Sequence, residues 1–269
     1  MDKVLPKISV IMASYNQGAF IKEALDRLLG QNYPNLELII VDGCSNDNTF
    51  KVLESYKEYI DILIHEPDRG MYHARNKGLV RATGEVICFL NTDDFHQAGT
   101  LNFVGSYFRD NLNVDVLYGI CLGVDESGNK LNGYCFGDFE LNRKTFFRQL
   151  PTFPDQATFI RRECLSVVGL YDLRLKYGAD ANLWRRCVLF NLRIQRVNKH
   201  LANWRIYENT LTYNPKFKWE RFFEAVGLYF RYSNNPFSKY LFKLFWNYAF
   251  VQPLKSNRLV LASIKKWRQ

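Results

Sequence analysis

The chain has 269 residues, of which 47% are hydrophobic and 16% aromatic, and its formal net charge at pH 7 is +9. Such a length is enough for one large α/β domain, or for one domain with an appendage. The six cysteines show no CxxC spacing, which argues against a zinc site or a disulfide framework and favours a reducing compartment. The N-terminus shows no secretory signal pattern, and no run reaches the ~18 apolar residues of a membrane span.

The excess positive charge lies at the C-terminal end of the chain. Residues 211–269 contain 11 Lys or Arg against two acids, whereas residues 1–210 contain 25 basic and 25 acidic residues. A basic and aromatic tail predicts contact with an anionic lipid surface or another polyanion. The alternative is a solvated helix whose aromatic side belongs to the core.

Apolar periodicity predicts alternating strands and helices in the first hundred residues. The predicted strands cover residues 7–12, 36–41, 60–64 and 86–90. The predicted helices between them cover residues 20–29, 46–59 and 71–81. Because this alternation is typical of βαβ units, we expect an α/β domain with a parallel sheet.

The pattern loosens in the second half of the chain. It predicts strands at residues 114–118 and 156–160, a hairpin turn at 125–129, and helices at 161–168 and 180–189. From residue 217 onward the tail is predicted to be helical in places, with breaks at 234–236 and 252–253. We therefore expect one domain with a tail that packs on it or on a membrane.

Two adjacent carboxylates, Asp93 and Asp94, follow the apolar strand predicted at residues 86–90. Ligands of open α/β sheets bind outside the carboxyl ends of the strands, so this pair is expected at a binding site. Adjacent carboxylates repel each other unless a cation or a proton lies between them. Mg²⁺ or Mn²⁺, held by carboxylates and substrate phosphates, would fit this position. The alternative is a turn that caps a helix near Gly99 and Thr100.

Five segments follow one another in order over the first hundred residues, at 8–16, 37–49, 66–78, 82–85 and 89–94. Together they closely resemble family 2 glycosyltransferases, the inverting enzymes of the GT-A fold, of the bacterial surface-polysaccharide type. Segments 155–162, 169–172 and 178–184 are similar to acceptor-side segments of that family. The resemblance implies a Rossmann-like, mostly parallel central sheet flanked by helices, with a helical, basic and aromatic C-terminal tail.

The resemblance also implies that different parts of the chain have different functions. Residues 1–210 would form the GT-A domain, with the nucleotide sugar bound by residues 1–110 and the acceptor by residues 111–210. Residues 211–269 would form the basic, aromatic helical extension. The implied reaction moves a sugar from a nucleotide-diphosphate sugar to a hydroxyl of a saccharide or lipid-linked acceptor, with Mn²⁺ or Mg²⁺, in cell-surface polysaccharide biosynthesis.

The family's motifs name candidate donor-binding residues. Asp93 is the first candidate for the metal ligand, supported by Asp94, because a metal bridging the diphosphate neutralises its developing charge. Asn91 stands where the family often has the first Asp of its DxD motif, so it can bind a ribose hydroxyl without adding charge. His96, close to Asp94, is a weaker candidate metal ligand. The other expected donor contacts are Ala13, Tyr15, Asp42, Asp68 and Arg75.

Two of these positions carry a specific reservation. In many relatives a second acid follows the position of Asp42 and contacts the base, but this chain has Gly43 there. The sequence therefore does not identify the nucleotide. For Arg75, the alternative is an ordinary position on a helix surface.

An inverting transfer needs a base that removes the proton of the attacking hydroxyl. Asp180 lies in the segment where the family keeps this carboxylate, before a predicted amphipathic helix, so we expect it to be the base. Its alternative role is the N-cap of that helix. The fallback candidates are Asp155 and Asp172, and the family's frequent second Asp is replaced here by Asn182.

Other functional classes fit the sequence less well. An oxidoreductase of the dinucleotide-binding type should carry GxGxxG after the first strand, and a P-loop enzyme should carry GxxxxGK followed by Ser or Thr; neither motif is present. A nucleic-acid-binding protein would explain the basic tail but not the acids at strand and helix ends, so no nucleic acid is expected. A non-catalytic relative that binds nucleotide sugars is the other alternative, because Gly43 and Asn182 depart from the family pattern.

The tail motivates an expectation about location. It combines basic residues with a cluster of aromatic ones, namely Phe242, Phe245, Trp246, Tyr248 and Phe250 beside Lys239 and Lys243. We expect a saccharide on a lipid carrier as acceptor, and an anionic membrane surface as a partner of residues 211–269. The protein would then be cytoplasmic, or peripheral on the inner face of the cell membrane.

Overall fold

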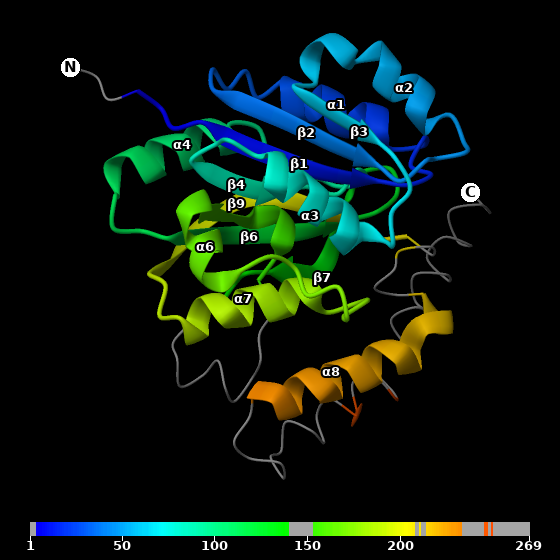
Figure 1. Ribbon diagram of the computed structural model, residues 1–269, viewed down its shortest axis with the longest axis vertical. Coiled ribbons are helices and arrows are strands. Elements are labelled where there is room, and N and C mark those ends of the chain that lie inside the picture. Colours follow the sequence, from blue (N-terminus) through cyan, green and yellow to red (C-terminus); the bar gives the residue numbers. More distant parts are fainter. Residues whose placement is uncertain are drawn as a thin grey trace.

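The computed structural model describes residues 4–139, 153–207, 210, 214–232, 245–246 and 249 (Figure 1). Its first half alternates strands and helices along the chain. These elements are β1 (Ile8–Ser14), α1 (Ile21–Leu29), β2 (Leu36–Asp42), α2 (Thr49–Ser55), β3 (Ile62–His65), α3 (Met71–Arg81) and β4 (Val86–Phe89). As predicted, β1 pairs in parallel with β2 and β4, and β2 pairs in parallel with β3.

The second half completes the same sheet with antiparallel and parallel pairs. Its elements are β5 (Phe95–His96), α4 (Thr100–Asp110), β6 (Val116–Val124), β7 (Lys130–Phe136), β8 (Thr158–Arg161), α6 (Leu165–Val168), α7 (Ala179–Leu189), β9 (Ile194–Arg205) and α8 (Lys218–Tyr232). The nine-stranded sheet has the order β3-β2-β1-β4-β8-β6-β9-β5, with β7 beside β6. Because β8 runs antiparallel to β4, the two halves of the chain share one sheet.

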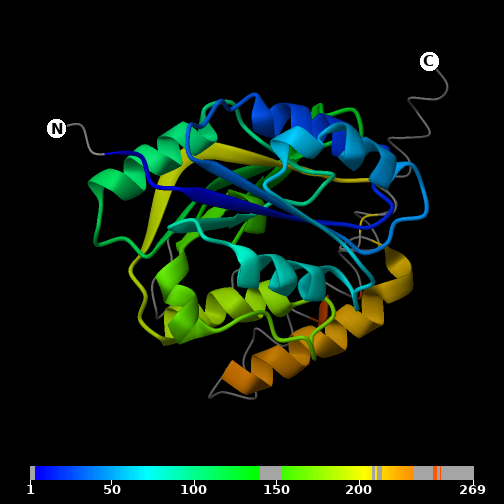
Figure 2. The ribbon, with the colours of Figure 1, turned by 45° about the horizontal axis from the view of Figure 1, so that its top comes forward.

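Helices cover both faces of this sheet (Figures 1 and 2). Helices α1, α2 and α4 bury apolar side chains against one face, and α3, α6 and α7 bury theirs against the other. All four residues of β4 are buried, as expected for a strand covered on both sides. Helix α8 lies alongside α7, on the side away from the sheet. This layered arrangement confirms the predicted α/β class.

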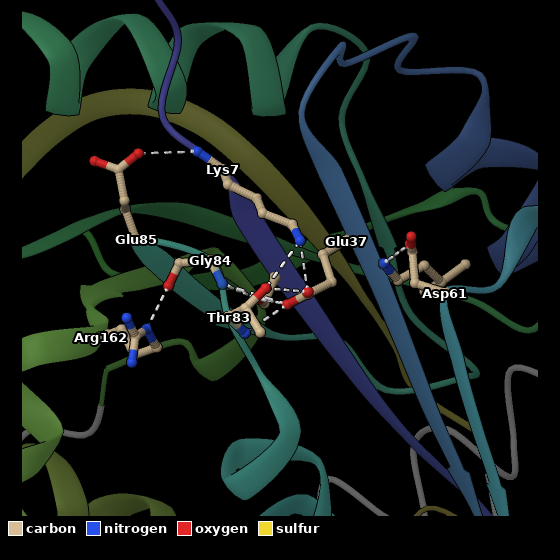
Figure 3. Close-up of polar contacts among 9 residues, drawn as sticks. Lys7, Glu37, Asp61, Thr83, Gly84, Glu85 and Arg162 are labelled. Carbon is tan, nitrogen blue, oxygen red and sulfur yellow. Dashed lines mark hydrogen bonds and ion pairs between the residues drawn. The ribbon is translucent and has the colours of Figure 1, made fainter.

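A buried carboxylate ties together the amino ends of neighbouring strands (Figure 3). Glu37, on β2, accepts hydrogen bonds from the Lys7 ammonium (2.7 Å), the Thr83 backbone N–H (2.8 Å) and the Ser9 hydroxyl. Burial opposes the ionisation of Glu37, but these hydrogen bonds outweigh it and lower its pKa to about 2. The segment between α3 and β4 is therefore fixed against β1 and β2, which positions two elements that carry site residues.

Some parts of the fold differ from the sequence-based expectation. Strand β9, with twelve residues, was not predicted, and the helix expected at 161–168 is a 3₁₀ turn (Arg162–Cys164) followed by the short α6. The predicted hairpin turn is confirmed, since the Asp125 N–H donates to the Asn129 carbonyl (2.8 Å) between β6 and β7. Among the described residues, no helix has the length and apolar character needed to cross a bilayer.

The expected C-terminal extension is described only in part. Helix α8 confirms helical structure after residue 217. Of the predicted aromatic cluster, Phe245 and Trp246 are described and largely exposed. The rest of that cluster lies outside the described residues, namely Lys239, Phe242, Lys243, Tyr248 and Phe250.

Candidate active site

The carboxyl ends of β1, β2 and β4 meet at one edge of the sheet. The parallel register places Ser14 beside Asp42, and Phe89, the last residue of β4, beside Ile11. The predicted donor residues that follow these ends are therefore neighbours. Ala13 is half-buried and Tyr15 is exposed at the end of β1. This is the edge at which open α/β sheets bind ligands.

Asp42 is completely buried, and its carboxylate is engaged within the protein. It accepts hydrogen bonds from the Ser45 backbone N–H (2.9 Å) and hydroxyl (2.5 Å), and His65 Nδ1 lies 2.8 Å away. The next residue is Gly43, where a Cβ atom would lie 2.5 Å from Oδ2 of Asp68. The structure thus brings Asp68 to the position beside Asp42, where a side chain at residue 43 would otherwise be.

Asn91 links the acidic pair to the interior of the protein. Its Nδ2 donates to Oδ2 of Asp94 (2.9 Å), and its Oδ1 accepts from Nη2 of Arg75 (2.8 Å). An Asp at this position would place another carboxylate against Asp94 and would have no N–H to donate. The neighbours of Asn91 therefore suit an amide at this position, where the family often has an Asp.

Asp94 is completely buried, and its two oxygens accept three hydrogen bonds. The donors are the Arg205 backbone N–H (2.8 Å), Nε2 of Gln156 (2.6 Å) and Nδ2 of Asn91. Burial, and then the adjacent charge of Asp93, raise the pKa of Asp94 well above its usual value. These contacts anchor the turn after β4 to the end of β9, and the role of Asp94 as a metal ligand stays a prediction.

Asp93 is half-buried and has fewer protein contacts than Asp94. Its Oδ2 accepts a hydrogen bond from the Tyr207 hydroxyl (3.1 Å), and burial raises its pKa. In the part of the chain that the structure describes, no three His, Cys, Asp or Glu side chains gather as a metal site. A divalent ion at Asp93 would therefore take most of its ligands from phosphates and water, which is how Mg²⁺ is usually bound beside substrate phosphates. The residues present fit such an ion.

His96, the weaker metal candidate, is buried in the core. Its Nε2 lies 3.1 Å from the Gln156 carbonyl and 3.5 Å from Sγ of Cys88. Burial lowers the pKa of His96 to about 4, so the imidazole is neutral at physiological pH. Its contacts are those of a core residue.

Arg75 is completely buried on α3, which excludes the alternative of a helix-surface position. It forms an ion pair with Asp155, and its guanidinium carbon lies 5.2 Å from the centre of the Phe89 ring. Burial opposes the charge on Arg75, but the carboxylate of Asp155 raises its pKa above the usual value. Asp155 also accepts a hydrogen bond from Nε1 of Trp184 on α7 (3.0 Å). This buried pair connects the two halves of the chain.

Asp180 is the second residue of α7 and is half-buried. Its Oδ1 accepts the backbone N–H of Ala181 (2.6 Å), while the N-cap position of the helix belongs to Gly178. Burial, followed by the charge of Asp155, raises the pKa of Asp180 to about 6. A carboxylate with a pKa close to the working pH is suited to general base catalysis.

The two fallback candidates for the base are engaged elsewhere. Asp155 forms the buried ion pair with Arg75. Asp172 forms ion pairs with Arg174 (2.8 Å) and Arg231 (3.1 Å), which hold its pKa well below the usual value. These contacts favour Asp180 as the base.

The comparison with known families agrees with this geometry. Residues 9–169, more than half of the chain, match the family described as Glycosyl transferase family 2. The chain belongs to this family. A relative from Mycobacterium tuberculosis, a "PGL/p-HBAD biosynthesis glycosyltransferase", is 32% identical over 186 residues, which are 68% of this chain and 70% of that protein.

Two further proteins are similar to this glycosyltransferase. The Escherichia coli UDP-Glc:alpha-D-GlcNAc-diphosphoundecaprenol beta-1,3-glucosyltransferase WfgD is 40% identical over 120 residues, which are 44% of this chain and 46% of WfgD. The solved structure of mannosyltransferase PcManGT from Pyrobaculum calidifontis, in complex with GDP-Man and Mn²⁺, superposes with a TM-score of 0.65 at 20% identity. That match covers 98% of this chain and 76% of PcManGT. The family and the GT-A fold are confirmed, and a glycosyltransferase is favoured over the oxidoreductase, nucleic-acid-binding and non-catalytic alternatives.

Gln156 and Tyr207 contact the acidic pair and were not predicted from the sequence, and neither was the backbone N–H of Arg205 on Asp94. Gln156, which holds Asp94, lies in segment 155–162, so the resemblance contained a signal for it. Tyr207, which holds Asp93, follows β9, a strand that was itself not predicted. Nothing local to Tyr207 in the sequence pointed to the acidic pair.

Proposed function

We propose that this glycosyltransferase moves a sugar from a nucleotide-diphosphate donor to an acceptor hydroxyl, with inversion at the anomeric carbon. The observation that carries the proposal is a series of interactions, three contacts and one electrostatic effect, that leads from the acidic pair to the candidate base. Asp94 contacts Asn91, which contacts Arg75. Arg75 pairs with Asp155, whose charge acts on Asp180. This series supports a single site that combines the acidic pair with a carboxylate of raised pKa.

In the proposed reaction, Asp180 acts on the acceptor. Its carboxylate accepts the proton of the acceptor hydroxyl while that oxygen forms a bond to the anomeric carbon. The bond between the anomeric carbon and the diphosphate oxygen breaks, and the diphosphate leaves with the electron pair. Because attack comes from the face opposite to the leaving group, the configuration inverts.

Asp93 is the residue that we propose as holder of Mn²⁺ or Mg²⁺, with Asp94 keeping its turn in place. When bound, such an ion would neutralise the negative charge that develops on the leaving diphosphate. Support comes from the adjacent acids Asp93 and Asp94 directly after β4 and from the presence of Mn²⁺ with GDP-Man in PcManGT.

The nucleoside would lie beside β1 and β2. We assign it to the exposed ring of Tyr15, the half-buried Ala13 and Asp68, with the buried Asp42 acting behind Asp68 through its bonds to Ser45 and His65. Because Asp68 covers Gly43, its carboxylate is placed to supply the contact that many relatives are expected to make from residue 43. Arg75, which is buried, would act on the donor through Asn91.

Donor binding is tested by melting the protein with UDP, GDP, dTDP or CDP, each with and without Mn²⁺. We expect one diphosphate to raise the melting temperature by about 5–10 °C at a hundredfold excess over Kd, and only with the metal. Asp93→Ala should abolish this shift, whereas Asp26→Ala, which removes an exposed acid on α1, should leave it unchanged. A metal-independent shift that survives Asp93→Ala would contradict the metal assignment, and no shift with any diphosphate would contradict the donor class.

For the acceptor, we propose a lipid-linked saccharide reached at the cytoplasmic face of an anionic membrane. Trp219, Phe223 and Phe230 are about half exposed or more and form one stripe along α8, with Leu228 buried on the opposite side. Aromatic side chains beside an excess of basic residues are typical of helices that lie in the membrane interface. The name of WfgD, which specifies a diphosphoundecaprenol-linked acceptor, supports this class of acceptor.

Membrane contact is tested by sedimentation with vesicles of phosphatidylglycerol and phosphatidylcholine. We expect the Trp219→Ser/Phe223→Ser variant to bind at least about tenfold more weakly, since a buried large apolar side chain contributes ~1.5–3 kcal/mol. Phe190→Ser, which removes an exposed ring at the end of α7, is the matched control. If the wild-type protein does not bind anionic vesicles at low salt, the membrane proposal is wrong.

A further inference from the structure

Helix α8 holds the segment that leads into the candidate base. The carboxylate of Glu224 accepts hydrogen bonds from three successive backbone N–H groups, those of Lys176 (2.7 Å), Tyr177 (2.8 Å) and Gly178 (2.5 Å). Helix α7 begins directly after these residues, and Asp180 is its second residue. One side chain of α8 thus binds the whole segment before the base.

This contact lies at the start of α7, where the N-cap residue offers no side chain. The N–H groups at the start of a helix have no partner within the helix, and an N-cap side chain usually accepts one of them. The N-cap of α7 is Gly178, which has no side chain and makes no capping hydrogen bond. Glu224, from another helix, binds the N–H of this N-cap residue and those of the two residues before it, and its charge makes the hydrogen bonds stronger than those between neutral groups.

The two helices approach each other closely at this point. A Cβ atom on Gly178 would lie 2.9 Å from Cδ1 of Leu228 and 3.3 Å from Oε1 of Glu224, so glycine permits the contact. One turn into α7, Nδ2 of Asn182 donates to the Tyr232 hydroxyl (2.6 Å). Helix α8 therefore contacts the residues on both sides of Asp180.

From the donor side, the same segment is held by α3. The Tyr72 hydroxyl donates to the Tyr177 carbonyl (3.1 Å) and also interacts with Asp180. We propose that Glu224 is a positioning residue for the base: by fixing residues 176–178 from outside, it keeps Asp180 at the distance from the acceptor hydroxyl that proton transfer requires. This inference rests on the proposed role of Asp180 and makes α8 a part of the catalytic machinery.

The test compares Glu224→Ala with Glu220→Ala in the full-length chain, using a donor identified by the diphosphate panel. Glu220 lies one turn earlier and, among the described residues, its side chain contacts side chains of the same segment, the Tyr177 hydroxyl and the Lys176 ammonium. For Glu224→Ala we expect kcat to fall about 10- to 100-fold with the donor KM unchanged, because small displacements of a catalytic group have large effects. Glu220→Ala should stay close to wild type. Glu224→Gln, which keeps an acceptor oxygen, should recover part of the loss.

A second variant tests the same inference with every acid in place. Gly178→Ala would place a Cβ atom against the side-chain ends of Leu228 and Glu224 and would disturb the Glu224 hydrogen bonds, so it should lower kcat in the same direction as Glu224→Ala and should also serve if that variant does not fold. Wild-type kcat in either folded variant, or a loss confined to the donor KM, would overturn the inference. An inactive wild-type enzyme would instead contradict the proposed function, so the two failures are distinct.

Discussion

Replacement of Asp180 by Asn is expected to lower kcat by about 10²- to 10⁴-fold, the usual contribution of a positioned general base. Asn has the same size and keeps an oxygen for the Ala181 N–H, so the fold and the donor KM should be unchanged. The loss arises because an amide does not accept the proton of the acceptor hydroxyl. Release of the nucleoside diphosphate, followed with and without acceptor, measures the effect.

The pH profile gives a second measurement on the same residue. Burial and the charge of Asp155 raise the pKa of Asp180 to about 6, so the active, ionised form is lost as the pH falls through 6. For the wild-type enzyme, kcat/KM should therefore rise with pH up to about 6 and then level off. Asp180→Asn should lack this acidic limb, whereas Asp172→Asn, which alters an ion-paired carboxylate, should keep it. An unchanged limb in Asp180→Asn would show that another group is the base.

Replacement of Arg75 by Leu is expected to lower the free energy of unfolding by about 3–5 kcal/mol, because it leaves a buried carboxylate without its counter-charge. Arg75 and Asp155 are both almost completely buried, and Trp184 would be left to hold Asp155 through one hydrogen bond. Urea denaturation of the purified variants measures the effect. Lysine at this position should not restore stability, because it lacks the planar fork that contacts Asp155, Tyr171 and Asn91 together.

Two control variants separate the effect of an unpaired buried charge from those of a surface ion pair and of lost packing. Arg174→Ala removes an exposed partner of Asp172 and should cost no more than about 1 kcal/mol, as is usual for surface ion pairs. The double variant Arg75→Leu/Asp155→Leu should be more stable than Arg75→Leu alone, since no charge is then left buried. If the double variant is as unstable as the sum of the single ones, lost packing rather than the unpaired charge explains the effect.

The sequence predicted the strands, helices and motifs that depend on a local pattern of residues. Continuous apolar runs identified β1, β2, β3 and β4, and the bounds of α3 agree with the predicted helix at 71–81. The residues at the carboxyl ends of these strands came from contiguous motifs, so they were found together. Strand β9 was missed because polar and charged residues interrupt it, and only its pairing with β6 and β5 makes it a strand.

The sequence did not predict which distant residues contact the site residues. Arg75 and Asp155 are 80 residues apart, and Asp94 and Gln156 are 62 residues apart, so only the folded sheet brings them together. The pKa of Asp180 depends on that arrangement for the same reason. Glu224 did leave a signal, since it is one of only two acids among residues 211–269.

The buried pair of Arg75 and Asp155 also bears on how such enzymes diversify. It joins residues 1–110 to residues 111–210, and β4 and β8 pair across the same boundary. Exchanging residues 111–210 for those of a relative would leave Arg75 alone in the interior unless the incoming segment brings an acid to its side. We therefore expect Arg75 and an acid at position 155 to be conserved together during evolution. New acceptor preferences should arise by substitution in the segment before α7 and on α8, and not by recombination of the two halves.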